Sequence, residues 1–328
     1  MVLRRRHWLL ASVAAATGGS LARAVRAQGS YPNRPIRMII PVGVGGVTDV
    51  VGRIYAEHMQ GTLGRPVVVE NIPGAGSRVG AAAFLRTPAD GYTFMIGTNN
   101  HPVMRAIDPN FPHDPVTDFI PFALVGRQPF VLAVHPDVPA RDVPSLLAWL
   151  PEKREAANFG ATNPGATNHL AGELFRKLTR VTYTIVPYRT AANAVQDLVA
   201  GRVQVTIDSP TMLAPPMQDQ RVRGLAVSSA KPSDLVPGLP SIQDTGVAGY
   251  EVTAWQVLFA KPGTPPEIVT VLEDAARRAV ADPALRQRLA NVGVEVWPDS
   301  SAAAAAAHVR AEVERWAPLV AEMNLRPT

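Results

Sequence analysis

Two glycine-rich segments, each leading directly into an amphipathic helix, are the parts of this sequence best suited to bind an anion. In the first, the apolar stretch that begins at Ile36 runs into a glycine loop and then into a helix. The first N–H groups of a helix have no partner within it, and the helix dipole adds positive charge there, so a carboxylate or phosphate is favoured. Glycine also lets a ligand approach the backbone closely. The candidate ligand residues of this loop are Val42, Gly43, Val44, Gly45, Gly46, Thr48 and Asp49.

A purely structural interpretation of this loop stays open, because glycines also close tight turns between a strand and a helix. In that interpretation Thr48 and Asp49 only cap the helix. Beside an anion site, Asp49 has three possible roles. It holds a bridging water, caps the helix N-terminus, or binds the ammonium group of an amino-acid ligand.

The second segment, NFGATNPGATNHLAGELF at residues 158–175, is denser in polar atoms. Its hydroxyl, amide and backbone donors surround Gly165 at the start of an apolar-periodic helix. In the first turn of that helix, His169 is placed to donate a hydrogen bond to a carboxylate. The alternative is a capping cluster that only stabilises the helix. The candidate ligand residues here are Thr162, Asn163, Gly165, Ala166, Thr167 and His169.

Strand ends supply the remaining candidates, because ligands of open α/β sheets bind at the carboxyl ends of the strands. Tyr188 ends one expected strand, Ala191 starts the helix that follows, and Asp208 ends the next strand. Thr98 and Asn99 follow a strand expected at residues 93–97. For Asp208, contact with a ligand or hinge and simple capping of a loop are equally open.

The motifs that most enzymes need are missing from the sequence. It has no cysteine, no G-x-S-x-G elbow, no Walker loop and no histidine spacing typical of a metal site. Gly74, Gly76 and Gly80 are spaced like a dinucleotide-binding turn, but the next strand ends at Gly97 without the acid that would bind a ribose. We therefore expect no catalytic residue, no metal and no cofactor.

Strand-like and helix-like patterns alternate along the chain, which indicates an α/β fold with open sheets. Strands are expected near residues 36–41, 67–70, 93–97, 130–135, 183–187, 203–207, 224–227 and 256–261. The clearest helices are expected at residues 48–63, 168–178, 191–200, 266–281 and 302–323. Four prolines between residues 109 and 121 indicate an irregular lead-in to a domain crossing, and a second crossing is expected near Trp255.

The N-terminus predicts an exported protein. Residues 1–27 combine three consecutive arginines, a short apolar run and small residues before Gln28, which is typical of a cleavable signal of the Sec or twin-arginine type. The apolar run is too short to span a membrane. Removing the five arginines of this segment from the 32 basic residues leaves 27, equal to the 27 acidic residues. A neutral mature chain argues against a nucleic-acid partner, and the absence of cysteine suits the periplasm.

Several spaced motifs give the sequence a family resemblance. They are YPNRPIRMIIPVGVGGVTDVVGR, RPVVVENIPGAG, ADGYTFMIGTN, NHLAGELF, VPYRTAANAVQDLVAGRVQV and FAKPGTPPEIV. Together they resemble the substrate-binding proteins of tripartite tricarboxylate transporters, the Bug (TctC-like) family, from Tyr31 to about Leu325. The resemblance implies a two-domain α/β periplasmic binding protein of type II-like architecture, with two crossing strands and a ligand cleft between the domains. By position, it implies ligand contacts at residues 42–49, 162–169 and 188–192 and at Asp208.

The domain division that follows has a signal peptide at residues 1–27, a discontinuous first domain at 28–127 plus 255–328, and a second domain at 128–254. The expected function is capture of a small organic carboxylate by closure of the two domains, followed by delivery to membrane permease subunits. We expect a monomer without nucleic acid or metal. Two alternatives are a sensor subunit that presents its ligand to a membrane receptor, and a periplasmic enzyme that uses His169 with Asp208 on an organic acid. The sequence does not identify the carboxylate.

Overall fold

The computed structural model describes residues 31–153, 157–162, 165–297 and 299–323. The expected signal segment and the candidate ligand residue Asn163 lie outside this part of the chain. Within it, none of the helices combines the length and the apolar character that a membrane span requires.

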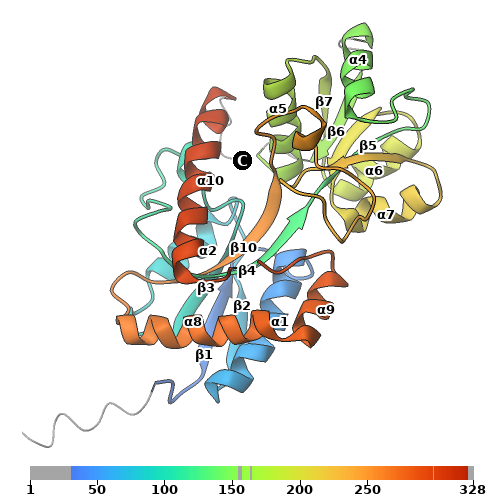
Figure 1. Ribbon diagram of the computed structural model, residues 1–328. Coiled ribbons are helices and arrows are strands. Elements are labelled where there is room, and N and C mark those ends of the chain that lie inside the picture. Colours follow the sequence, from blue (N-terminus) through green and yellow to red (C-terminus); the bar gives the residue numbers. More distant parts are fainter. Residues whose placement is uncertain (1–30, 154–156, 163–164, 298, 324–328) are drawn as a thin grey trace, which may run out of the picture.

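Two five-stranded mixed sheets, each with helices packed on it, form two lobes (Figure 1). The strand order is β2-β1-β3-β10-β4 in the first sheet and β7-β6-β8-β5-β9 in the second. The first sheet contains β1 (Ile36–Ile40), β2 (Val67–Asn71), β3 (Thr93–Thr98), β4 (Ile120–Pro129) and β10 (Thr253–Ala260). The second contains β5 (Val131–Val134), β6 (Asn158–Thr162), β7 (Thr184–Tyr188), β8 (Val205–Asp208) and β9 (Arg223–Val227). This two-lobe architecture confirms the predicted fold class.

The first lobe buries both faces of its sheet because side chains alternate along each strand. Met38 and Ile40 of β1 pack in one cluster with Val51, whereas Ile39 packs in another with Phe84. The helices that contribute to the first cluster are α1 (Val47–Leu63), α8 (Pro266–Ala281) and α9 (Pro283–Ala290). Those that contribute to the second are α2 (Arg78–Leu85), the short α3 (Met104–Ile107) and α10 (Ala302–Glu322).

The second lobe follows the same rule. On β5, Leu132 and Val134 pack in one cluster, and Val131 and Ala133 pack in the other. The first of these clusters includes residues of α4 (Val143–Lys153) and α5 (Thr167–Thr179), and the second includes residues of α6 (Ala191–Val199) and α7 (Pro210–Gln218). A 3-10 turn at Gln243–Thr245 precedes the return of the chain to the first lobe.

The chain passes between the lobes twice, at Phe130 between β4 and β5 and at Val252 before β10. The buried Ser228, after β9, joins the two passages. Its hydroxyl accepts a hydrogen bond from Phe130 N at 2.7 Å and donates one to the Val252 carbonyl at 2.5 Å. The two predicted crossings are therefore present, and one side chain holds them together.

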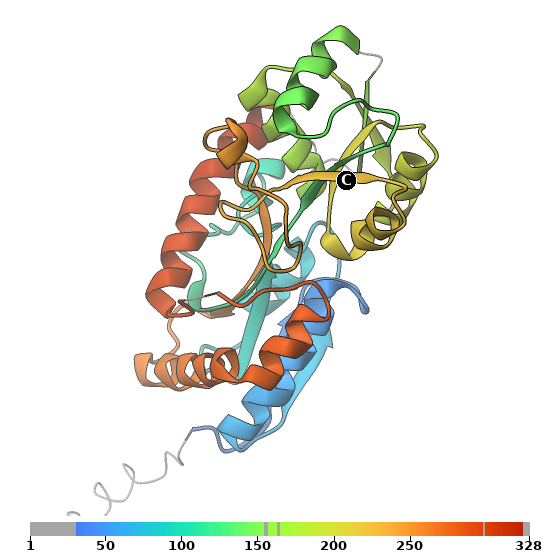
Figure 2. The ribbon, with the colours of Figure 1, turned by 45° about the vertical axis from the view of Figure 1, so that its right-hand side comes forward.

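Helix α10 contacts both lobes. Its N-terminal half packs on the first sheet through Ala305 and Val309, while Trp316 and Leu319 belong to the apolar cluster of the second lobe. Figure 2 shows this helix running along the side of the molecule from one lobe to the other. Trp316 donates to the buried Glu312, which also accepts from an indole of the crossing strand β10. The last helix is thus anchored at the crossing as well as in both cores.

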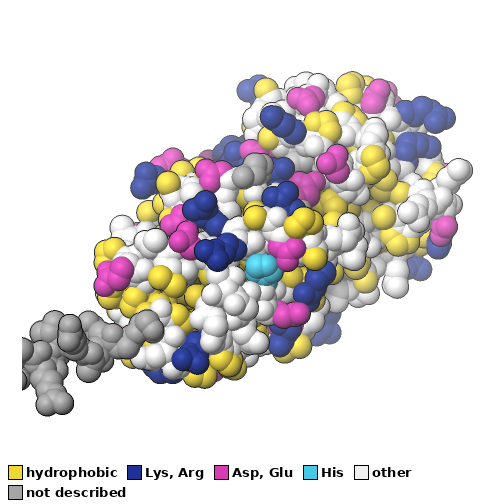
Figure 3. Space-filling model, turned by 60° about the horizontal axis from the view of Figure 1, so that its bottom comes forward, with side chains coloured by type: hydrophobic (Ala, Val, Ile, Leu, Met, Phe, Trp, Pro, Cys, Tyr) yellow, Lys and Arg dark blue, Asp and Glu magenta, His cyan; other side chains and the backbone are white. Residues whose placement is uncertain are grey.

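Most sequence-based elements are present, with ends that differ by up to three residues. The expected strands missed β4 and β6. Strand β4 begins inside the proline-rich stretch and carries Pro121 and Pro129, which a sheet tolerates because β4 lies at its edge. On the face shown in Figure 3, acidic and basic side chains are interspersed, in keeping with the 27 acidic and 27 basic residues at positions 28–328.

Candidate functional site

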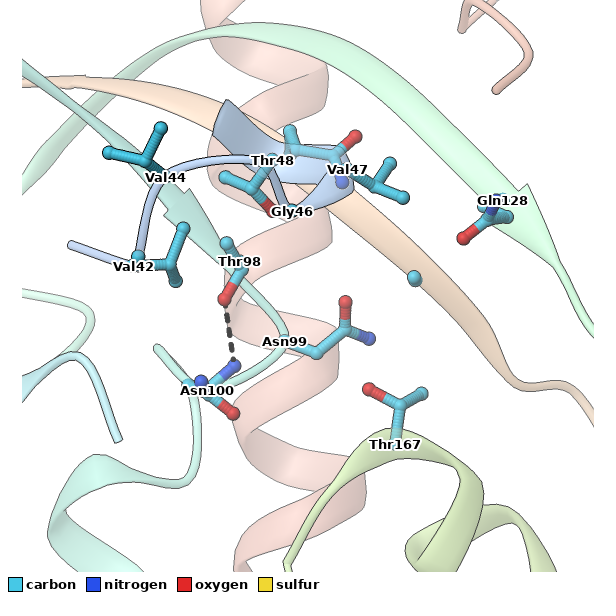
Figure 4. Close-up of a pocket in the computed structure, with 13 residues that line it drawn as sticks. Val42, Val44, Gly46, Val47, Thr48, Thr98, Asn99, Asn100, Gln128 and Thr167 are labelled. Atoms are coloured by element: carbon cyan, nitrogen blue, oxygen red, sulfur yellow. Dashed lines mark hydrogen bonds between the residues drawn. The ribbon is translucent and has the colours of Figure 1, made fainter. Parts of the chain in front are cut away.

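A cavity of about 450 Å³ lies where the two lobes meet the crossing strands, within the size range of small-molecule sites (Figure 4). The loop before α1, the end of β3, the strands β4 and β10 and the start of α5 all contribute to it. Its lining residues are Val42, Gly43, Val44, Gly46, Val47, Thr48, Thr98, Asn99, Asn100, Gln128, Thr167, Ala254 and Gln256.

The N-terminus of α1 faces this cavity with its backbone donors free. The N-cap residue is Gly46, and no side chain caps the helix. The amides of the first turn therefore have no acceptor within the helix, and Val47 and Thr48 place this turn in the cavity wall. Val44, at the tip of the preceding loop, is 75% exposed and offers an apolar surface to a ligand. An anion bound here meets N–H groups and the positive end of a 17-residue helix.

Asp49 holds this loop in shape. Its carboxylate accepts hydrogen bonds from Gly45 N at 2.9 Å, from Asn71 Nδ2 at 2.8 Å and from Arg53 Nε at 3.1 Å. Asn71 Nδ2 also donates to the Val42 carbonyl. Burial raises the pKa of Asp49, but the bonds from Arg53, Gly45 and Asn71 outweigh burial and leave the pKa below its ordinary value. The carboxylate is therefore ionised, and its acceptor positions are occupied by the protein itself.

In the second lobe, the start of α5 faces the same cavity through Thr167. The N-cap residue is Ala166, again without a side-chain capping bond. In the view of Figure 4, the side chain of Thr167 points toward Asn99, which belongs to the first lobe. The two predicted helix N-termini are thus brought together at one cavity.

A chain of hydrogen bonds supports this second helix start from behind. Asn168 accepts from the Thr162 hydroxyl at 2.5 Å and donates to Asp208 at 2.9 Å. Asp208 is 3% exposed and also accepts from Ser209 N at 2.7 Å. Burial raises its pKa above the ordinary value, against these hydrogen bonds. Asp208 therefore ties the end of β8 to α5 and does not line the cavity.

Three other candidates of the second lobe also have partners within the protein. His169 Nδ1 accepts from Gly165 N, and burial lowers the pKa of His169, so the ring is neutral and its proton lies on Nε2. Tyr188 donates its hydroxyl to Asp197 at 2.7 Å. Ala191 is the first residue of α6, whose N-terminus is capped by Thr190.

The structure divides the predicted site residues into two groups. Those that line the cavity are Val42, Gly43, Val44, Gly46, Thr48, Thr98, Asn99 and Thr167. The other described candidates are not among its lining residues: Gly45, Asp49, Thr162, Gly165, Ala166, His169, Tyr188, Ala191 and Asp208. A ligand role for either group stays a prediction.

Asn99 lines the cavity but its amide is already engaged with the crossing strand. Its Nδ2 donates to the Thr253 carbonyl at 2.6 Å, and its Oδ1 accepts from Trp255 N at 2.8 Å. Thr98 accepts from Asn100 N (Figure 4). The end of β3 is therefore bound to the start of β10, next to the place where the chain changes lobe.

Five lining residues were not predicted: Val47, Asn100, Gln128, Ala254 and Gln256. Val47 and Asn100 are direct neighbours of predicted residues. Gln128 and Gln256, together with Ala254, come from the crossing strands, where sequence analysis placed the crossing but no ligand contact. A single amide between apolar residues of β10 is the signal that could have found Gln256, whereas Gln128 follows Gly126 and Arg127 and has no such signal.

The dinucleotide-like glycines have a packing role. A Cβ on Gly80 of α2 would lie 2.6 Å from Pro41 Cβ and 2.7 Å from the Ile72 carbonyl oxygen. Gly80 thus lets α2 approach the end of β1 closely. In the described part of the chain, no group of three or more His, Asp or Glu side chains is arranged to hold a metal ion.

Comparison with known proteins agrees with this geometry. The model of the family described as "Tripartite tricarboxylate transporter family receptor" matches residues 51–325. A relative from Pseudomonas sp. (strain P51), the "UPF0065 protein in tcbD-tcbE intergenic region", is 34% identical and the match covers 98% of this chain and 95% of that one.

Two solved structures have the same fold. The structure of the periplasmic binding protein BugD is 30% identical with a TM-score of 0.72, and the match covers 90% of this chain and 99% of that one. The structure of Rpa4515 from R. palustris with adipate is 33% identical with a TM-score of 0.74, and the match covers 90% and 98%. These matches confirm the resemblance that the motifs predicted.

Proposed function

Because the chain belongs to the tripartite tricarboxylate transporter receptor family, we propose that it is a periplasmic solute-binding protein that passes a small organic carboxylate to the membrane subunits of such a transporter. The single observation that carries this proposal is that two uncapped helix N-termini, one from each lobe, face one cavity. Neutral N–H and hydroxyl donors bind an anion without a fixed counter-charge. Such binding is strong enough for capture and weak enough for release to a permease.

Capture proceeds by closure of the lobes. The carboxylate first docks on the amides of Val47 and Thr48, which the network around Asp49 holds in place before the ligand arrives. Closure then brings the α5 start and the Thr167 hydroxyl onto the same ligand. We propose residues 28–127 plus 255–328 and residues 128–254 as the moving domains, with the segments joined by Ser228 as the hinge.

Calorimetry with a panel of organic acids tests this function. The panel contains dicarboxylates, tricarboxylates, aromatic acids and acidic amino acids, and we expect at least one to bind with a Kd in the micromolar range or below. Mass spectrometry of small molecules released from the purified protein would identify retained cargo. A protein that binds no organic acid in either experiment would contradict the proposal.

The site assignment has its own test. Thr48→Ala combined with Thr167→Ala removes one hydroxyl from each lobe and leaves the backbone donors in place. We expect binding to weaken by roughly ten- to a hundredfold, because each lost hydrogen bond is worth about 1 kcal/mol. Thr270→Ala, an exposed threonine on α8, is the matched control and should leave affinity unchanged. Undiminished affinity in the double variant would remove these threonines from the site.

The sensor alternative shares the same site and differs in the partner at the outer surface. An assay of uptake of the identified acid by cells with and without this protein separates the two, since a sensor would change transcription without being needed for uptake. The enzyme alternative relied on His169 acting with Asp208. Their hydrogen-bond partners are Gly165 for the histidine and Asn168 and Ser209 for the aspartate, and neither His169 nor Asp208 lines the cavity.

A further inference from the structure

Two glutamines on the crossing strands form part of the cavity wall with unsatisfied polar atoms. Gln128 of β4 and Gln256 of β10 both line the cavity and are only 4% and 2% exposed. Gln128 Nε2 and Gln256 Oε1 are buried without a hydrogen-bond partner. A buried polar atom left unpaired costs about 1–3 kcal/mol, so natural folds keep few of them. Two on one small surface mark these glutamines as side chains whose amide orientation the protein does not fix.

The strand register places both side chains on the same face. Gln256 pairs with Gly126, and Ala254 pairs with Gln128. Residues two apart on a strand share a face, so the two glutamines are diagonal neighbours with small residues opposite them. The register shifts directly after Gln256, and such bulges redirect side chains next to binding sites.

Glycines keep the space behind each amide. A Cβ on Gly126 would lie 2.8 Å from Gln256 Oε1, and a Cβ on Gly293, whose φ is +73°, would lie 3.0 Å from Gln128 Nε2. The unpartnered atoms therefore point into the protein wall. Figure 4 shows the amide oxygen of Gln128 directed toward the cavity. Gln128 thus has one end of its amide in the wall and the other toward the cavity, and Gln256 also lines the cavity with its unpaired Oε1 buried.

The unpaired atoms in the wall allow each terminal amide to adopt either of two orientations. Because neither wall atom has a partner, a half-turn of the terminal amide exchanges its donor and acceptor at the cavity without breaking a hydrogen bond. The pair can therefore match a group that donates, accepts or does both. Among the described residues that line the cavity, none carries a formal charge. A second carboxylate at the two carboxamides would lose its water for at most two side-chain N–H donors, without the backbone donors and dipole of the α1 N-terminus, whereas a hydroxyl, carbonyl or amide would be satisfied.

We propose that Gln128 and Gln256 determine specificity, and that the ligand is a small monocarboxylate with a neutral hydrogen-bonding group at its far end. The carboxylate binds at the N-terminus of α1, and the neutral group binds the two carboxamides. This inference rests on the proposed function, which requires only that some organic carboxylate binds.

The test uses sets of acids that differ only at one end. For each chain length from three to six carbons, the set contains the acid with a methyl end, the acid with a terminal hydroxyl and the dicarboxylate. Calorimetry on the full mature chain compares the wild type with Gln128→Met and Gln256→Met, which keep side-chain length but remove the amide. Gln60→Met, on an exposed position of α1, is the matched control.

We expect the wild type to bind the hydroxylated acid of the best chain length about tenfold more tightly than the methyl-ended acid and the dicarboxylate, since one buried hydrogen bond is worth about 1 kcal/mol or more. Each Met variant should reduce that preference to twofold or less, with unchanged affinity for the methyl-ended acid. Thermal unfolding should show an equal or higher Tm, because each variant removes an unpaired polar atom.

Three results would overturn the inference while leaving the proposed function in place. They are a dicarboxylate as the tightest ligand, equal affinity for the hydroxylated and methyl-ended acids, and an equal loss of affinity for all three acids in the Met variants. The last would mean that the glutamines only position the strands. If the wild type bound none of the acids, nor any in the wider panel, the proposed function itself would fail.

Discussion

Replacing Asp49 with asparagine separates two opposite effects of a buried carboxylate beside an anion site. Asp49 is 2% exposed and accepts from Gly45 N, Asn71 and Arg53. Asparagine has one acceptor oxygen and an NH₂ group that would meet one of these three donors. At least one charge-assisted hydrogen bond is then lost, so we expect Asp49→Asn to lower the free energy of unfolding by about 2–3 kcal/mol.

The effect on ligand affinity depends on whether the gain from removing the negative charge or the cost of ordering the released loop is larger. Removing a negative charge roughly 10 Å from an anion, at an effective dielectric constant of about 20, would strengthen binding by up to about 2 kcal/mol. Arg53 Nη2 lies 3.0 Å from Asp49 Oδ1, so it already cancels most of that field. Releasing Gly45 leaves the loop to be ordered when the ligand binds, at about 1–2 kcal/mol for each residue fixed. The loop term is larger, and we expect affinity to fall about tenfold.

Calorimetry with the tightest-binding acid of the panel measures the change in affinity, and thermal unfolding measures the change in stability. Asp274→Asn on α8 is the matched control, because that carboxylate is 58% exposed and also pairs with an arginine on its own helix. Tighter binding by Asp49→Asn would refute the reasoning, since the effect of the charge would then outweigh the cost of ordering the loop.

The pKa of Asp49 lies below its ordinary value, so its contribution to stability is present above pH 4 and is lost as pH falls through the folded pKa. The stability difference between wild type and variant should shrink accordingly in acid.

Three further predictions concern the crossing and the core. Ser228→Ala leaves the buried N–H of Phe130 without its acceptor, and chemical denaturation should show a loss of about 1–3 kcal/mol. Glu312→Ala leaves two indole N–H groups unpaired and should cost about 2–6 kcal/mol by the same assay, whereas Glu312→Gln keeps an acceptor and should cost less. Burial lowers the pKa of His101 to about 4, so its contribution is fully present above pH 6.5 and is lost as pH falls toward 4. Up to about 3 kcal/mol should disappear over that range, and His101→Phe should flatten this part of the pH profile of Tm.

The fold could be predicted well wherever local pattern and burial agree. Strand β1 is an apolar run interrupted only by Arg37, with a glycine loop after it, and α8 starts at Pro266 as its sequence indicates. Strand β4 was missed because its prolines and its Gly-Arg-Gln stretch look like a loop. Its place as an edge strand beside β10 depends on residues more than a hundred positions away, which no local pattern contains.

In the candidate site too, the features set by local sequence could be predicted and those set by distant contacts could not. Thr48 and Thr167 both line the cavity, as expected, because a helix start and its glycine loop are neighbours in sequence and the geometry of the proposed anion site is local. Asp49 and Asp208 were placed correctly near their loops, but their partners Asn71 and Asn168 decide whether they face the ligand or the protein. Both carboxylates hold the loops in place. This role depends on partners that are distant along the chain, so the local sequence does not reveal it.

The two parts of the cavity therefore differ in how freely evolution can change them. The carboxylate end is made of backbone amides, whose donors persist under most side-chain substitutions as long as the loop keeps its shape. The far end is made of two side chains on paired strands, and Gly126 and Gly293 leave the space that their amides occupy. Single substitutions there change which group is bound without disturbing the carboxylate site. A receptor built in this way keeps its ligand class while its preference within that class is set by residues such as Gln128 and Gln256.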